Sequence, residues 1–287
     1  MANNGTLVVG AVAYDPKVVD IWEGFKSWFG DHGLSLDYVL FSNYERLVES
    51  LVEGQVHVAW NSPLAWVRAR RLAASAGVSV RAIAMRDTDC DLRSVIVAMP
   101  GGDVRDVLDL KGRTVAVGAP DSPQATLLPL AALSAHGLQP HEDFTVRVFD
   151  VLGGKHGDHV GGERDAAAAL AAGEVDAACL LAANRKLFES EGLFGPAGVA
   201  VIASTEPFDH CNFTVTSAAP DDLIEEFRGL LLGMSYDDPA TKPLFDLEGL
   251  RRWVPARTSG YEQLERAVDE MGFYDDSGRI AAAGYSY

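Results

Sequence analysis

Residues that could carry thiol chemistry lie in two short segments of the chain. The segment "RDTDCDLRSVIV" places Cys90 and Arg93 just before an expected strand, and "STEPFDHCNFTV" places His210 beside Cys211. A neighbouring arginine or histidine can stabilise a thiolate and so activate it as a nucleophile. Neighbours in a strand point to opposite faces, however, so adjacency does not make His210 and Cys211 a catalytic pair. We keep these four residues as catalytic candidates only if the protein is an enzyme, and the alternative for the first segment is a polar connecting loop.

A third cysteine and a histidine-rich loop complete the reactive side chains. Cys179 lies in the apolar run "VDAACLLA" and is predicted to be an inert packing residue. The loop "GGKHGDHVGG" carries His156, Asp158 and His159, a spacing that a metal ion could use, although glycine-rich loops with histidine are usually solvated surface. We therefore assign no metal and no cofactor.

A turn that could bind an anion lies in "APDSPQATLLP", where a helix is expected to begin. Unpaired backbone N–H groups and the positive end of the helix dipole favour an anion there, with Ser122, Gln124 and Thr126 as candidate ligand-binding residues. The alternative is that Ser122 is only an N-cap, with Pro123 at the first helical position. Both interpretations are open. Arg164 is a further candidate, because a guanidinium can bind a carboxylate or phosphate at two points.

Strands and helices alternate along most of the chain. Segments 6–13 and 34–41 read as strands, and 16–33 and 43–54 as helices; the same order recurs after residue 100. "LVEGQVHVAWNSP" and "LAAGEVDAACLLA" repeat one pattern, a helix that ends at a glycine followed by a short buried strand. After residue 220 the segments "PDDLIEEFRGLLLGM", "EGLRRWV" and "GYEQLERAVDEMGF" read as covering helices. This pattern predicts an α/β fold with two similar halves and mainly parallel sheets.

The composition limits the partners. Asp and Glu outnumber Lys and Arg by 41 to 24, for a formal charge of −17, which makes nucleic acid an unlikely partner over most of the surface. Three scattered cysteines are too few for a disulfide framework. No stretch reaches the length of a transmembrane segment, and "MANNGTLVVGAVAYDP" lacks the features of a signal peptide. We expect a cytoplasmic chain as given, or a periplasmic one if a leader has been removed.

Several segments together resemble a known family. "YERLVESLVEGQVHVAWNSPLAWVRA", "LKGRTVAVGAPDSPQATLLPLAAL", "RDAAAALAAGEVDAACL" and "DDPATKPLFDLEGLRRWVPARTSGYEQLERAV" are similar to segments of the phosphate, phosphite and phosphonate substrate-binding proteins of ABC transporters. That resemblance implies the type II periplasmic-binding-protein fold, with two lobes and a ligand cleft between them. We expect lobe one to comprise residues 1–97 and 202–287, lobe two residues 98–201, and lobe one to hold both chain ends.

The resemblance also implies ligand-binding residues. In the family the turn after the strand that ends at Trp60 faces the ligand, so Asn61 and Ser62 become candidates. Trp60 and Trp66 could line the ligand site or belong to the hydrophobic core, and the core is the more common place for such residues. Tyr14, after the first strand, and His210, at the return crossing, complete the candidates for ligand binding. The family's Ser- and Thr-rich anion turn is altered here by Pro123 and Ala125, which weakens the case for a phosphonate.

Two functions from different classes follow. The first is a binding protein that takes up a small anionic or zwitterionic molecule of the phosphonate, phosphate, sulfonate or carboxylate type, with an ABC-transporter permease as a candidate partner. The second is a cytoplasmic enzyme on the same scaffold, a lyase or hydrolase acting on a small acid, aromatic acids included. Fold analogy alone does not choose between them, and we favour the binding protein.

Overall fold

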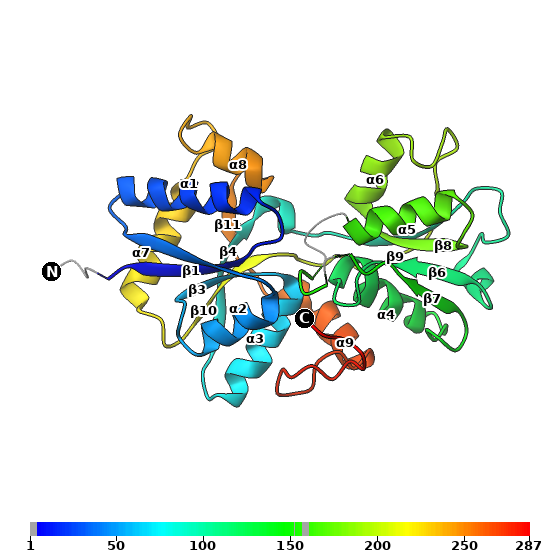
Figure 1. Ribbon diagram of the computed structural model, residues 1–287, viewed down its shortest axis with the longest axis horizontal. Coiled ribbons are helices and arrows are strands. Elements are labelled where there is room, and N and C mark those ends of the chain that lie inside the picture. The colour runs from blue at the N-terminus through cyan, green and yellow to red at the C-terminus, as the bar shows by residue number, and fades with distance from the viewer. Residues whose placement is uncertain (1–4, 152, 157–160) are drawn as a thin grey trace. The chain divides into compact units, whose positions relative to one another are not determined.

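The chain folds into two α/β units, each built on its own sheet. A computed structural model describes residues 5–151, 153–156 and 161–287. Contacts divide the chain into a first unit of residues 1–90, 209–261 and 274–280 and a second unit of residues 91–208, 262–273 and 281–287. Figure 1 shows the two sheets with their helices. The predicted α/β class is therefore observed.

The first unit holds a six-stranded sheet in the order β11-β4-β10-β3-β1-β2. Its strands are β1 (Leu7–Val12), β2 (Leu36–Phe41), β3 (Val58–Asn61), β4 (Val80–Arg86), β10 (Asn212–Thr216) and β11 (Trp253–Pro255). Its helices are α1 (Lys17–Asp31), α2 (Tyr44–Val52), α3 (Pro63–Ser75), α7 (Asp221–Gly233) and α8 (Lys242–Glu248), with short 3-10 turns at Asp87–Asp89 and Ser259–Tyr261. β1, β2 and β3 are parallel, while β10 runs antiparallel to β3 and to β4.

Helices cover both faces of this first sheet, as the alternation along β1 illustrates. Leu7 and Val9 pack into an aromatic core with α1, α7 and α8, whereas Val12 packs into a second core with α2 and α3. In Figure 1, α1 and α8 accordingly lie on the opposite side of the sheet from α2 and α3. A sheet covered on both faces needs apolar residues at successive positions, which is why "LVVGAV" is almost continuously hydrophobic.

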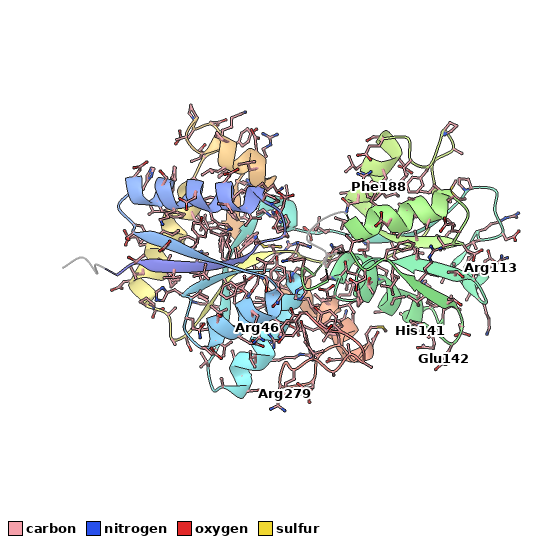
Figure 2. All side chains as sticks on the ribbon, viewed as in Figure 1. Arg46, Arg113, His141, Glu142, Phe188 and Arg279 are labelled. Atoms are coloured by element: carbon pink, nitrogen blue, oxygen red, sulfur yellow. The ribbon has the colours of Figure 1, made fainter. Side chains whose placement is uncertain are left out.

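The second unit holds a five-stranded sheet in the order β7-β6-β8-β5-β9. Its strands are β5 (Ser94–Ala98), β6 (Thr114–Val117), β7 (Thr145–Val148), β8 (Ala177–Leu181) and β9 (Ala200–Ser204). Its helices are α4 (Leu128–Ala135), α5 (Gly161–Ala171), α6 (Ala182–Ser190) and α9 (Glu262–Glu270), with a 3-10 turn at Val107–Leu110 and a π-helical turn at Pro123–Leu127. Phe188 of α6, labelled in Figure 2, is fully buried in the core that α5 contributes to.

The internal repeat predicted from the sequence is visible in the two sheets. β3 pairs in parallel with β1 and antiparallel with β10, and β8 pairs in parallel with β6 and antiparallel with β5. The glycines that precede the repeated strands, Gly54 and Gly173, have φ angles of 74° and 73°. Both therefore use the left-handed conformation that ends a helix at little cost for glycine.

The unit boundaries lie elsewhere than we expected. Residues 94–97, placed in lobe one by the sequence, form part of β5, which hydrogen-bonds antiparallel to β8 and β9 of the second sheet. The chain therefore changes units at 90/91 and 208/209, not at 97/98 and 201/202. Residues 262–273 and 281–287 also belong to the second unit, so the first unit does not hold both chain ends.

The segment "EGLRRWV" is not the covering helix that we predicted. Helix α8 ends at Glu248, because Gly249 takes the left-handed conformation with a φ of 74°. The chain then extends, and Trp253–Pro255 pairs antiparallel with β4 as strand β11. The apolar spacing that suggested a helix instead places Trp253 in the aromatic core.

Candidate functional site

Predicted site residues of the first unit gather at one edge of its sheet. The parallel strands β1 and β3 end at this edge, just before Tyr14 and Ser62. Because β10 runs antiparallel to β3, with Asn212 opposite Asn61, His210 and Cys211 also lie at this edge. The sequence separates these residues by up to about 200 positions, and the sheet register brings them to one place.

Asn61 is the most unusual residue of this edge. It is the last residue of β3 and is 0% exposed, and neither its Nδ2 nor its Oδ1 has a hydrogen-bond partner among the residues that the structure describes. A buried amide without partners costs about 1 to 3 kcal/mol, so native proteins seldom keep one without a reason. Ser62, which follows, is the N-cap of α3: its Oγ accepts a hydrogen bond of 3.1 Å from the Ala65 N–H.

The aromatic residues around this turn belong to the core. The Trp60 ring centroid lies 5.7 Å from that of Trp253, and the Trp66 centroid 5.7 Å from that of Tyr261. Trp60 is 7% exposed and Trp66 2%. Tyr14 is half-buried against the same core as Trp60. The core interpretation of the two tryptophans is therefore the one that the structure supports.

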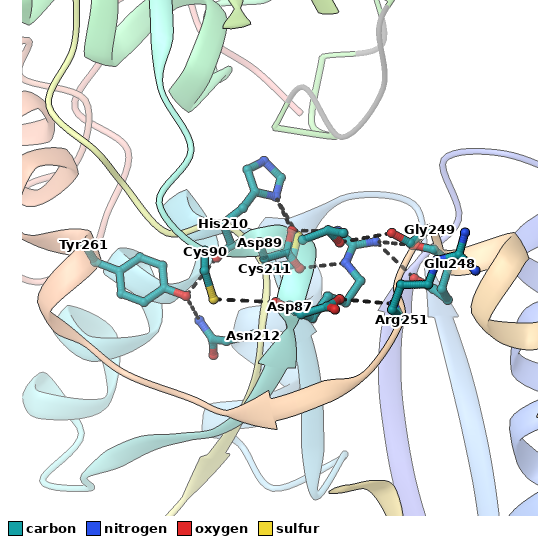
Figure 3. Close-up of polar contacts among 12 residues, drawn as sticks. Asp87, Asp89, Cys90, His210, Cys211, Asn212, Glu248, Gly249, Arg251 and Tyr261 are labelled. Atoms are coloured by element: carbon teal, nitrogen blue, oxygen red, sulfur yellow. Dashed lines mark hydrogen bonds and ion pairs between the residues drawn. The ribbon is translucent and has the colours of Figure 1, made fainter. Parts of the chain in front are cut away.

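A buried group of charges lies behind this edge (Figure 3). The Arg86 guanidinium donates to both oxygens of Asp89, from Nε at 2.6 Å and from Nη2 at 3.0 Å, and its Nη1 donates to Glu248 Oε2 at 3.1 Å. Burial raises the pKa of Glu248, and the charge of Arg86 opposes that shift. The pKa of Arg86 is raised well above its usual value, because the surrounding negative charges outweigh the effect of burial. The Arg86 charge is thus committed to protein carboxylates.

His210 and Cys211 meet each other and Asp89 in this group. The His210 Nδ1 lies 3.1 Å from Cys211 Sγ and 3.6 Å from Asp89 Oδ1. Adjacent strand residues would point apart, as we expected, but both residues precede β10, which begins at Asn212. Burial lowers the pKa of His210 to about 4, although the negative charge of Asp89 acts in the opposite direction. The imidazole is therefore neutral at physiological pH. Cys90 stands apart from the pair, with its Sγ 3.8 Å from the Arg86 carbonyl oxygen.

The predicted anion turn of the second unit lies at the carboxyl end of β6. Ser122 is an N-cap, because its Oγ accepts a hydrogen bond of 3.1 Å from Ala125 N–H. The Thr126 hydroxyl donates to the Ala119 carbonyl at 2.8 Å, and the Gln124 carbonyl accepts from the Ser94 hydroxyl at 2.6 Å. The structure thus supports the N-cap interpretation of Ser122, and leaves the Ser122 proton as the hydroxyl donor of this turn.

Two acidic residues beside this turn were not predicted as site residues. Asp121 is 0% exposed, and its Oδ2 accepts from Gly154 N–H at 2.6 Å and from the Tyr285 hydroxyl at 3.1 Å. Within the described ranges its Oδ1 has no hydrogen-bond partner. Glu163 lies in the first turn of α5. Its Oε2 accepts from Leu181 N–H at 2.8 Å, and burial raises its pKa to about 7. Nothing in the local sequence distinguishes either carboxylate from a solvated one.

The arginines of the second unit differ in what they bind. Arg164, our predicted anion clamp, is paired with Glu191, from Nη1 at 2.6 Å and from Nη2 at 3.2 Å, so we no longer assign it to a ligand. Arg93 donates from Nη1 to the Thr205 carbonyl at 2.8 Å, and no carboxylate is paired with it in the part of the chain that the structure describes. Arg93 belongs to the second unit and Cys90 to the first.

Two further predicted residues, Cys179 and His156, are buried in the second unit. Cys179 is 0% exposed in β8, as a packing residue should be, and burial raises the pKa of its thiol. Of the histidine-rich loop, Asp158 and His159 lie outside the described residues. His156 is 0% exposed, and its backbone N–H donates to Asp121 Oδ2 at 3.2 Å. Across residues 5–151, 153–156 and 161–287, no helix combines the length and the apolar character needed to span a membrane.

Comparison with solved structures gives several proteins of similar fold. PhnD1 from Prochlorococcus marinus, in complex with methylphosphonate, is 18% identical with a TM-score of 0.67, over 93% of this chain and 98% of that one. XAC2383 from Xanthomonas citri bound to ATP is 14% identical with a TM-score of 0.71, over 92% and 97%. The aliphatic sulphonate binding protein SsuA from Escherichia coli is 17% identical with a TM-score of 0.59, over 92% of each chain. The predicted two-lobed periplasmic-binding-protein fold is therefore confirmed.

The sequence itself decides the family. Residues 12–261 match the model of the family described as "ABC transporter, phosphonate, periplasmic substrate-binding protein". The match covers most of both units, and with it the enzyme alternative finds no support. A substrate-binding protein of this kind works with a small-molecule ligand and a transporter. The chain belongs to the phosphonate periplasmic substrate-binding proteins of ABC transporters.

Proposed function

We propose that this substrate-binding protein binds a small phosphonate or sulfonate anion through uncharged donors and one arginine. The unpartnered amide of Asn61 carries the proposal, since it is a fully buried polar group at the carboxyl edge of a parallel sheet. Ligands of open α/β sheets bind at this edge. The similar proteins described above hold methylphosphonate and ATP, and one is named for aliphatic sulphonates, so all three concern anions.

In the first unit the donor is the side-chain amide of Asn61. Its Nδ2 offers two N–H donors, and the neighbouring Ser62 caps α3 through its Oγ. The guanidiniums of Arg86 and Arg257 are each paired with a carboxylate, Asp89 and Asp209 respectively. We therefore assign ligand recognition in this unit to the neutral amide of Asn61.

In the second unit we assign Arg93 as the charged donor. Arg93 directly precedes β5, and Ser94 of that strand hydrogen-bonds the Gln124 carbonyl, so the start of β5 is tied to the turn that carries Ser122. A guanidinium has five donors, and one hydrogen bond to Thr205 leaves most of them available to an oxyanion. We assign Arg93 and Ser122 to the anion in place of Arg164.

Ligand titration by calorimetry tests this assignment. Methylphosphonate, methanesulfonate, inorganic phosphate and a neutral methyl amide serve as the panel, and thermal stabilisation should rise with the concentration of each true ligand. We expect Asn61→Ala and Arg93→Gln each to weaken binding of the best anion at least tenfold, about 1.4 kcal/mol. A panel in which only the neutral compound binds would refute the proposal.

Two matched variants control for general damage. Arg164→Gln removes a guanidinium that is already paired with Glu191, so affinity should stay within about twofold. Asn43→Ala removes an N-cap whose side chain accepts from Arg46 N–H at 2.9 Å, which should cost about 1 kcal/mol of stability without changing affinity. Asn61→Ala should show the reverse: weaker binding with little loss of stability, because its amide makes no hydrogen bond to lose.

We further propose that the protein passes its ligand to an ABC-transporter permease outside the cytoplasm, as the family's description implies. Reconstitution with the permease and ATPase from neighbouring genes tests this. Ligand-loaded protein should stimulate ATP hydrolysis by the transporter, and ligand-loaded Asn61→Ala protein at the same concentration should do so less. Equal stimulation by an unrelated acidic protein would count against the partnership.

A further inference from the structure

Three side chains of different chemistry converge in the first unit: the carboxylate of Asp89, the imidazole of His210 and the thiol of Cys211. Their ligand atoms all lie within 4.8 Å of one another, and all three residues are buried. Asp89 is 2% exposed, His210 8% and Cys211 2%. Figure 3 shows Asp89 and His210 pointing toward each other from the 3-10 turn after β4 and from the segment before β10. A buried set of this kind needs a chemical reason.

The distances fit a shared metal ion. Zinc bound to histidine at about 2.0 Å and to cysteine at about 2.3 Å in tetrahedral geometry places N and S about 3.5 Å apart, and N and a carboxylate O about 3.3 Å apart. The corresponding distances here are 3.1 Å and 3.6 Å. These two distances differ from the tetrahedral ones by a few tenths of an ångström, and Cys211 Sγ lies within 4.8 Å of an Asp89 oxygen.

The same geometry argues against a nucleophilic triad. In such a triad the histidine uses one ring nitrogen toward the nucleophile and the other toward the carboxylate. Here both Cys211 Sγ and Asp89 Oδ1 are neighbours of the same atom, Nδ1. Atoms that converge on one point are arranged as ligands to a common centre, not as a relay through the ring.

The surroundings supply the outer contacts that metal ligands usually have. Arg86 donates to both oxygens of Asp89 and orients the carboxylate. The His210 backbone N–H donates to the Asp89 carbonyl at 2.8 Å, and the Tyr261 hydroxyl donates to the His210 carbonyl at 2.8 Å. Such outer hydrogen bonds fix ligand orientation in known metal sites.

The charges of this group also balance with a divalent ion. Arg86 contributes one positive charge, and Asp89 and Glu248 contribute two negative charges when both are ionised. When Cys211 binds a metal it loses its thiol proton to solvent and adds a third negative charge. A divalent cation then brings the buried group to neutrality, which burial favours.

We propose that Asp89, His210 Nδ1 and Cys211 Sγ form a site for one divalent transition-metal ion of the zinc type, with a fourth coordination position left to water. Thiolate and imidazole ligands favour Zn²⁺ or Co²⁺ over Mg²⁺ and Ca²⁺, which prefer oxygen ligands alone. The site goes beyond the proposed anion binding and uses none of the residues assigned to it.

Cobalt substitution on tag-free, full-length protein is the test. Chelator-treated protein titrated with Co²⁺ should develop a thiolate-to-cobalt charge-transfer band that saturates at one equivalent and disappears when Zn²⁺ is added. Cys211→Ser should abolish the band, and His210→Gln should weaken Co²⁺ binding by more than the roughly 10- to 100-fold expected from loss of an outer contact. Cys90→Ser, a nearby thiol outside the cluster, should leave the titration unchanged.

Each outcome of this titration decides for or against the site. If Cys211→Ser fails to fold, as judged by circular dichroism, the test rests on two other measurements: the Co²⁺ affinity of His210→Gln and the number of Co²⁺ equivalents that saturate the wild-type protein. Absence of a charge-transfer band in wild-type protein at saturating Co²⁺ would overturn the proposal. A band that survives in Cys211→Ser, or is lost in Cys90→Ser, would overturn it as well. Unchanged anion binding in Asn61→Ala, together with an intact cobalt band, would count against the proposed function alone.

Discussion

Glu163 should make the stability of the second unit depend on pH near neutrality. Its side chain is 2% exposed in the first turn of α5, and burial raises its pKa to about 7, whereas the ordinary value is 4.5. Between these two values the folded chain keeps a proton that the unfolded chain has released. The free energy of unfolding therefore falls as pH rises from about 4.5 to about 7, and then stays low.

The size of the effect follows from the shift. A difference of about 2.5 pKa units corresponds to about 3 kcal/mol, at 1.36 kcal/mol per unit. Glu163→Gln removes the titration but keeps a side-chain oxygen that can accept from Leu181 N–H and from Asn184 Nδ2, as Glu163 Oε2 does at 2.8 Å and 3.0 Å. The variant should therefore be more stable than the wild type at pH 8, by about 1 to 3 kcal/mol, and similar to it at pH 5.

Urea unfolding at pH 5, 6, 7 and 8 measures this difference. Subtracting the wild-type curve from the Glu163→Gln curve cancels the histidines that titrate in the same range. Glu191→Gln in the same unit is the control: its carboxylate is exposed and paired with Arg164, which lowers its pKa, so its difference curve should be flat above pH 5. A wild-type stability that does not change between pH 5 and 8, or a Glu163→Gln variant that is less stable at pH 8, would refute the reasoning.

Two further variants probe packing at specific contacts. Gly162→Ala would place a Cβ 2.5 Å from the carbonyl oxygen of Phe149, the residue that follows β7, so α5 must shift away from the end of that strand. We expect the free energy of unfolding in urea to fall by about 1 to 3 kcal/mol, and a neutral result would mean that α5 adjusts freely. Arg68 is 5% exposed, and its Nε donates to the Gly278 carbonyl at 2.9 Å. Arg68→Ala should therefore lower the free energy of unfolding by about 2 to 4 kcal/mol and make the segment around Gly278 accessible to limited proteolysis. Arg46→Ala on α2 is the control, because the Arg46 side chain is 63% exposed; Figure 2 labels this residue. It should change neither the free energy of unfolding nor the rate of proteolysis. Equal cleavage of the two variants would contradict the role of Arg68.

The sequence determined much of the fold because the relevant signals are local. Alternating strands and helices, continuous apolar runs and helix-ending glycines such as Gly54 and Gly173 predicted the two similar α/β halves. Ser62 and Ser122 each precede a proline and cap the turn that follows, as their sequence context indicated. The unit boundaries were less well predicted, because β5 could have paired in either sheet and only its long-range partners β8 and β9 decide which.

Tertiary structure alone decided which polar residues are available to a ligand. Arg93 and Arg164 look equivalent in sequence, yet one meets a carbonyl and the other a carboxylate 27 residues away. The cluster of Asp89, His210 and Cys211 is equally invisible in sequence, since about 120 residues separate Asp89 from the other two. Local sequence sets the propensity for helix or strand and the helix caps. The ion pairs of a side chain, its burial and its pKa depend instead on which distant residues the sheet register brings together.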